Sequence, residues 1–110
     1  MNRLATALTV MFLVAVTFTW DMPTTNTDGS PLTDLAGARI YCGTETGVYS
    51  LLADPGNVTT YTTMVFQKEI PQYCVMTAYN TSGGESVWSV ERNFTYRLGP
   101  DAPTNLRVTF

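Results

Sequence analysis

Residues 16–23 read VTFTWDMP, and the alternation within this stretch decides the fold class. Apolar Val16, Phe18 and Trp20 alternate with two threonines, so one face of the segment is apolar and the other is polar. A period of two residues is that of a β-strand with one face against a core. Pro23 then marks the turn in which this strand is expected to end.

The rest of the chain is also rich in threonine, valine and tyrosine, and turn residues recur at short intervals. About seven short strands, with no helical periodicity beyond the N-terminal segment, predict an all-β sandwich. Apart from the first, strands are expected at residues 38–42, 48–53, 58–65, 72–79 and 87–97. One core between the two sheets is expected to contain Val16, Phe18, Trp20, Ile40, Tyr61, Cys74, Met76 and Ala78.

Composition limits the classes of function. The chain has 110 residues, which suits one domain, and 45% of them are hydrophobic, which is enough apolar material for one core. The net charge is −3 and no basic patch is present, which argues against nucleic acid as a partner. The sequence has no histidine, the commonest general base and metal ligand. We therefore predict no catalytic site, metal site or cofactor, and we interpret the loop carboxylates as solvated turn residues (Asp21, Asp28, Asp34 and Asp54).

Residues 1–15 resemble a secretory signal peptide. A basic tip, Met1-Asn2-Arg3, precedes an apolar run that is shorter than the ~20 residues of a transmembrane helix. Cleavage after Ala15, an uncleaved export anchor and an ordinary N-terminal strand or buried helix are the alternatives. Export would make this a secreted, cell-surface or virion protein and would place its two cysteines in an oxidising compartment.

Several segments, read together, resemble a fibronectin type III domain over residues 16–98. The stretch at residues 16–23 is similar to the second strand of that family, ARIYCGT at 38–44 to the third, and TTYT at 59–62 to the fifth. Residues 76–86, MTAYNTSGGES, are similar to the sixth strand and its exit loop. The sequences of these segments are most similar to those of short exported bacterial and bacteriophage proteins with one such domain. The resemblance implies the fold and leaves the function open, since this sandwich serves many unrelated roles.

Two departures from the family pattern stand out. Gln72 occupies the position where the family has a tyrosine that pins the preceding loop, so the conformation of residues 67–71 is open. The first strand also has no counterpart before residue 16, because residues 3–20 contain no Gly, Pro, Asn or Asp to turn a hairpin. A sequence that resembles the first strand of the family, PTNLRV, occurs instead at residues 103–108.

The C-terminal tail, residues 99–110, is therefore a candidate interface. We expect residues 104–110 to pair as a strand with another subunit, in the manner of donor-strand assembly. Pro103, Leu106 and Val108 are the candidate contacts, with Leu106 and Val108 filling a groove beside residues 16–20. A free linker tail, or an edge covered by the chain's own N-terminal run, are the alternatives.

The resemblance also makes the third and sixth strands antiparallel neighbours. A register that aligns Ala38 with Ala78 places Ile40 opposite Met76, and it places Cys42 opposite Cys74. Directly opposed residues lie at about the separation that a disulfide requires, ~4.5–5.5 Å between Cβ atoms. This register predicts a Cys42–Cys74 disulfide, and two buried free thiols are the alternative.

These observations predict a non-catalytic structural or interaction module of a bacterial or phage surface, with no stable membrane span. Its partner is expected to be a second copy or a neighbouring structural subunit. The alternative is a carbohydrate-binding or adhesion module that contacts a surface glycan through loops 21–33 and 81–86. Trp88 is a candidate contact residue in either case, because aromatic anchors dominate interfaces, although it could instead pack against neighbouring strands.

Overall fold

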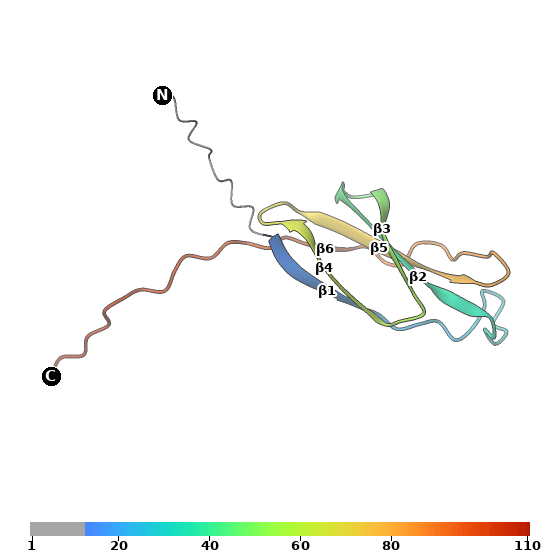
Figure 1. The fold of residues 1–110 in the computed structure, drawn as a ribbon, viewed down its shortest axis with the longest axis horizontal. Helices are drawn as coiled ribbons and strands as arrows, with labels where there is room; N and C mark the ends of the chain where they lie inside the picture. The colour runs from blue at the N-terminus through green and yellow to red at the C-terminus, as the bar shows by residue number, and fades with distance from the viewer. Residues whose placement is uncertain (1–12) are drawn as a thin grey trace, which may run out of the picture.

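The computed structural model describes residues 13–110, which contain a sandwich of two antiparallel sheets, no helix and a C-terminal tail outside the sandwich (Figure 1). One sheet has two strands, β1 (Leu13–Thr19) and β4 (Thr60–Gln67). The other has the order β3-β2-β5-β6, made by β2 (Leu35–Glu45), β3 (Val48–Gly56), β5 (Gln72–Asn80) and β6 (Arg92–Phe94). The predicted all-β sandwich is confirmed. Among the described residues, no helix is long and apolar enough to cross a membrane.

The N-terminal end of the sandwich lies slightly earlier than expected. Strand β1 begins at Leu13, so residues 13–15 of the signal-like segment belong to the sheet. The rest of that segment, residues 1–12, lies outside the described residues. The sandwich therefore includes three residues that a cleavage after Ala15 would remove.

Four buried side chains, Ile40, Cys42, Phe66 and Cys74, form the centre of the core. Five of the eight predicted core residues pack against this centre (Val16, Phe18, Trp20, Tyr61 and Met76), and a sixth, Cys74, belongs to it. The fully buried Ile40 is also as predicted, whereas Ala78 is half-buried and lines a groove at the edge of the core. Phe66 and Phe94 are core residues that the sequence pattern did not indicate.

The pairing of β2 with β5 follows the predicted register. Ala38 faces Ala78, Ile40 faces Met76, and Cys42 faces Cys74. The sulfur atoms of the two cysteines are 2.05 Å apart and bonded, so the predicted disulfide is present. It joins the two central strands of the four-stranded sheet.

The last predicted strand, residues 87–97, is wrong in extent. Only Arg92–Phe94 pairs with β5, and residues 86–90 run beside β5 without a regular ladder. Two serine hydroxyls take the place of backbone carbonyls there. Ser86 Oγ accepts the Ala78 N–H at 3.0 Å, and Ser89 Oγ accepts the Met76 N–H at 2.9 Å. Because these hydroxyls satisfy the amides of β5, residues 86–90 need not adopt strand geometry.

The loop at residues 67–71 is held from the β6 side. Glu69 has a φ of 66° and donates its backbone N–H to the Tyr96 carbonyl at 2.8 Å. Its carboxylate accepts the Leu98 N–H at 2.5 Å and lies 3.7 Å from the Arg97 guanidinium. These contacts fix the loop where the family pattern would have used a tyrosine at position 72.

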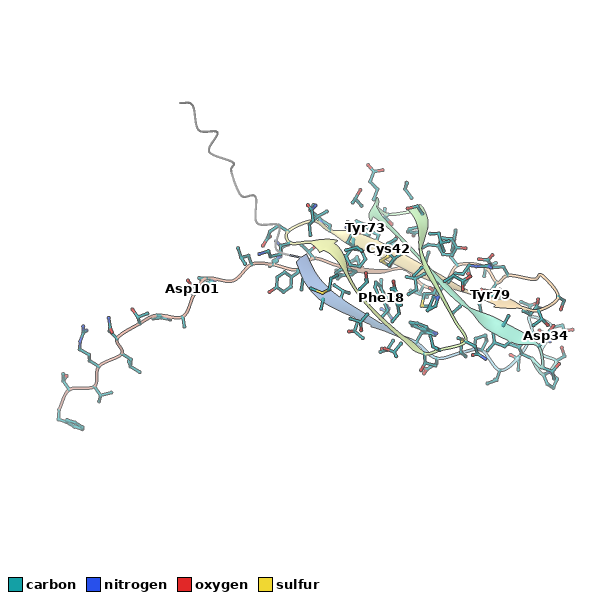
Figure 2. All side chains as sticks on the ribbon, in the orientation of Figure 1. Phe18, Asp34, Cys42, Tyr73, Tyr79 and Asp101 are labelled. Atoms are coloured by element: carbon teal, nitrogen blue, oxygen red, sulfur yellow. A yellow bond between two sulfur atoms is a disulfide. The ribbon has the colours of Figure 1, made fainter. Side chains whose placement is uncertain are left out.

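The C-terminal tail has no strand in the isolated subunit, so the described residues contain six strands and not seven. It leaves the sandwich beside the start of β1 and extends away from the domain, and Asp101 lies well outside the sandwich (Figure 2). No hydrogen bond, ion pair or ring contact of the described residues involves residues 101–110. The sandwich is thus complete without the tail, except along one edge.

Candidate interaction site

One edge of β1 is open. Among the described residues β1 pairs with β4 alone. Trp20 donates its N–H to the Thr59 carbonyl at 3.1 Å, so the alternation of an antiparallel ladder directs the backbone groups of Thr17 and Thr19 away from β4. The Thr17 and Thr62 hydroxyls, 2.8 Å apart, agree with this phase, since side chains lie closest at non-hydrogen-bonded pairs. Unpaired backbone groups along a strand are a template for another strand.

A groove of about 1020 Å³ runs beside this open edge. One wall is β1 and its continuation, residues 14–23, and the other wall is formed by residues 86–96. The floor includes Met76 and Ala78 of β5. The groove is therefore elongated along β1, and apolar side chains line much of it (Val14, Val16, Trp20, Val87, Val90 and Phe94).

The indole of Trp20 carries an unmet hydrogen-bond donor in this groove. Its Nε1 atom is buried and is the one buried side-chain nitrogen or oxygen among the described residues without a partner. A buried polar group without a partner costs about 1–3 kcal/mol.

The predicted contacts on the tail are exposed. Leu106 is 92% exposed and Val108 is 73% exposed, while Phe110 and Pro103 are also exposed. Apolar Leu106, Val108 and Phe110 alternate with polar Arg107 and Thr109. The structure thus provides an apolar groove and an exposed segment with the pattern of a half-buried strand, but it does not join them within one subunit.

The fold has a solved counterpart. The structure is similar to the solution structure of a fibronectin type III domain derived from the human KIAA0970 protein, with a TM-score of 0.63 and 20% sequence identity, over 91% of this chain and 77% of that chain. The fold is that of a fibronectin type III domain. At this identity the likeness shows the fold alone. No protein-family model matches the chain, and no match was found among curated proteins.

The outer face of the fibronectin type III sandwich carries Trp88. Its ring lies 4.7 Å from Tyr41 and 5.6 Å from Tyr49 between centroids, near perpendicular to both. Even so, 51% of the residue is exposed. A smaller cavity of about 490 Å³, lined by Tyr41, Glu85 and Trp88 among others, lies beside it. Trp88 therefore packs on neighbouring strands, which was one of the two expectations, while its role as a contact residue stays a prediction.

A network of charged and phenolic groups covers the same face of the fibronectin type III sandwich. Arg39 contacts Asp54 at 3.2 Å and Glu85 at 2.8 Å, and its guanidinium lies 3.9 Å from the centre of the Tyr79 ring. Tyr79 donates its hydroxyl proton to Asp54 at 2.5 Å, which lowers the pKa of the Asp54 carboxyl and raises the pKa of Tyr79. Asp54 is thus a partner in a network and not the solvated turn residue that was predicted.

Glu85 and Glu91 are bound in a similar way. The Thr77 hydroxyl donates a hydrogen bond to the Glu85 carboxylate at 2.6 Å, and the Tyr41 hydroxyl donates another at 2.7 Å. Both bonds lower the pKa of Glu85, and the bond from Thr77 has the larger effect. The Tyr49 hydroxyl donates to Glu91 and lowers its pKa, and the Thr46 hydroxyl adds a further bond at 2.9 Å. These acceptor sites are already occupied by the protein's own donors. Hydrogen bonds between side chains on this part of the face therefore connect β2, β3, β5 and residues 85–91.

These shifts predict how stability depends on pH. Since Asp54, Glu85 and Glu91 have lowered folded-state pKa values, their contribution is complete above the unfolded-state pKa and is lost as pH falls below about 4. Tyr41, Tyr49 and Tyr79 have raised folded-state pKa values, so their contribution is lost as pH rises above about 10. Urea unfolding midpoints measured against pH should fall at both ends. Glu85→Gln should flatten the acid limb, and an unchanged acid limb in this variant would contradict the role of Glu85.

Of the remaining loop carboxylates, Asp28 is an exposed turn residue as predicted, whereas Asp34 is half-buried and bonded to a distant loop. Asp28 accepts both the backbone N–H and the hydroxyl of Ser30, and these bonds lower its pKa. Asp34 accepts the Ser82 hydroxyl at 2.6 Å. Within residues 13–110, no group of three or more His, Cys, Asp or Glu side chains is placed to hold a metal ion.

Sequence reasoning located the open edge but missed the second wall of the groove. Val87 and Val90 are exposed apolar residues of that wall, and Phe94 closes it from β6. The signal that could have found them is the spacing of Ser86 and Ser89, which replaces strand alternation in residues 86–90. Two hydroxyls three residues apart can bond alternate amides of the adjacent strand, as they do here with β5.

Proposed function

We propose that this chain is a non-catalytic structural module of an extracytoplasmic assembly, on a bacterial or bacteriophage surface, and that its ends join it to neighbouring subunits. The observation that carries this proposal is the open edge of β1 beside an apolar groove. Natural sheet edges are usually short, charged or covered, because an open edge invites pairing. An edge left open beside a groove is therefore suited to receive a partner strand.

Two further observations support the location. Cys42 and Cys74 form a disulfide, and disulfides persist mainly in oxidising compartments outside the cytoplasm. The N-terminal sequence has the basic tip and apolar run of an export signal. Location and architecture together favour a building block of a cell surface or virion over a cytoplasmic protein.

Fractionation of producing cells or particles tests this function. The full chain, detected by an antibody, should be found in the extracytoplasmic or particle fraction, and thiol-blocking reagent added before lysis should leave Cys42 and Cys74 unmodified. A Cys42→Ala/Cys74→Ala variant controls for labelling of other groups. Recovery of the chain in the cytoplasm with both thiols alkylated would overturn the proposal.

Carbohydrate binding is a second candidate, favoured by the half-exposed Trp88 beside Tyr41 and Tyr49. Aromatic side chains supply large apolar contact surfaces, and sugar rings have apolar faces that could stack on them. Quenching of tryptophan fluorescence by soluble oligosaccharides, lost in Trp88→Ala, would favour this role over the structural one.

A further inference from the structure

The tail leaves the sandwich at the same pole where β1 begins. Leu13 pairs with Gln67 at the end of β4, and Phe94 at the end of β6 pairs with Gln72 at the start of β5. Glu69, in the loop between β4 and β5, contacts Tyr96 and Leu98. The start of β1 and the exit of the tail therefore lie together, as Figure 1 also shows.

This position prevents the tail from pairing antiparallel with β1 of its own subunit. Such a strand would have to begin near Trp20, at the far end of β1. Strand β1 has seven residues and spans about 23 Å. Residues 99–103, which would have to return along this distance and also reverse direction, reach at most about 18 Å. The linker is too short for antiparallel insertion within one subunit.

The same direction is correct for insertion into a second subunit. Strand β6 ends where β1 begins, so a tail that continues the course of β6 runs antiparallel to β1. If one subunit is displaced along the strand direction, its tail arrives at the Trp20 end of the next groove without a turn. Antiparallel pairing is also the slightly more stable arrangement per residue.

We propose that residues 103–110 of one copy occupy the groove beside β1 of a second copy and run antiparallel to β1. This proposal rests on the proposed structural function and names its partner. Leu106 and Val108 enter the apolar groove, and the donated backbone pairs with the outward groups of Thr17 and Thr19.

The interface joins two different surfaces, so it leaves a free tail on one copy and an open groove on the other. Such a heterologous contact does not close on itself when successive copies are related mainly by translation. The expected product is a head-to-tail chain of subunits, whose length depends on concentration. Each added subunit covers one open edge and one exposed apolar tail.

Light scattering on the full chain and two double variants tests the proposal. The full chain should form species that are multiples of the 12.1-kDa subunit and grow with concentration. Leu106→Asp/Val108→Asp should reduce the mass to that of one subunit, because two carboxylates cannot enter an apolar groove without a large desolvation cost. Asn105→Asp/Thr109→Asp is the matched control, since it adds the same charge at alternate positions and should still assemble.

A peptide experiment tests the site directly. A synthetic peptide of residues 99–110 should bind one-to-one to the chain that lacks residues 101–110, which retains every described hydrogen bond of the sandwich. Binding should slow hydrogen exchange at the Thr17 and Thr19 amides by about tenfold or more, because these donors become paired. The peptide with aspartate at positions 106 and 108 should leave their exchange unchanged.

The outcomes separate this proposal from the proposed function. Oligomers that persist in Leu106→Asp/Val108→Asp would overturn the donated strand, and so would peptide binding that leaves Thr17 and Thr19 unprotected. A full chain that is monomeric at every concentration, even with protected Thr17 and Thr19 amides, would also overturn it, since the tail would then not join two copies. In all these cases an oxidised chain in the extracytoplasmic fraction would leave the structural function standing.

Discussion

Replacing both Cys42 and Cys74 with alanine should lower the free energy of unfolding by about 3–4 kcal/mol. The bond closes a loop between residues 32 positions apart, and without it the unfolded chain regains the conformational entropy of that loop. Both cysteines are buried in the core, so their removal also sacrifices packing around Ile40 and Phe66. Urea unfolding of the oxidised protein and of the double variant measures the difference.

The reducing agent dithiothreitol supplies the control for this experiment. It should destabilise the unmodified protein and have no effect on the double alanine variant, because that variant has no bond to reduce. If the two oxidised proteins unfold at the same urea concentration with the same slope, the disulfide does not stabilise the sandwich. The two central strands would then be held by their ladder and packing alone.

Phe66→Ala should cost about 3–5 kcal/mol, the usual range for deletion of a buried aromatic side chain. Phe66 is only 5% exposed, and its ring lies 6.1 Å from that of Phe18 and 5.2 Å from that of Phe94 between centroids. It therefore joins β4 to β1 in its own sheet and to β6 in the opposite sheet. Alanine would leave a cavity at the point where the two sheets meet.

Val65→Ala is the matched control for Phe66→Ala. Val65 is the preceding residue on the same strand but is 60% exposed, so its truncation should change stability by less than about 0.5 kcal/mol. Chemical denaturation of both variants provides the comparison. A loss below about 1 kcal/mol for Phe66→Ala would show that the interface between the sheets tolerates a cavity there.

The β2–β5 pairing could be predicted from sequence because three residue pairs agreed on one register. Small, apolar and thiol residues each found a counterpart, and a shift by one residue would have broken all three matches. Phe66 could not be found in this way. A bulge between Val14 and Val16 shifts the register with β4, so that Thr63 and Phe66, three residues apart, are both buried. Period-two alternation cannot represent such a shift.

The candidate site also has parts that the sequence pattern predicts and parts that it does not. The open edge could be predicted because the N-terminal residues lack turn chemistry, and the pairing of the tail stays a prediction. The second wall of the groove was missed, because period-two alternation does not show how Ser86 and Ser89 bond to β5. The unpaired Trp20 Nε1 is likewise a product of packing, since nothing in the residue pattern around Trp20 specifies which donors find acceptors.

The position of the disulfide has a mechanical consequence for a chain of subunits joined as proposed. Tension would enter each subunit through its tail at β6 and leave through the neighbour's strand held along β1. Cys74 lies directly opposite Arg92, so one of the three β5 residues that pair with β6 is covalently tied to β2. Strands pulled along their length resist in shear, with several backbone bonds loaded together. The four-stranded sheet would then be the more rigid part of each subunit. The β1–β4 sheet has no disulfide among the described residues, so it would separate first under tension.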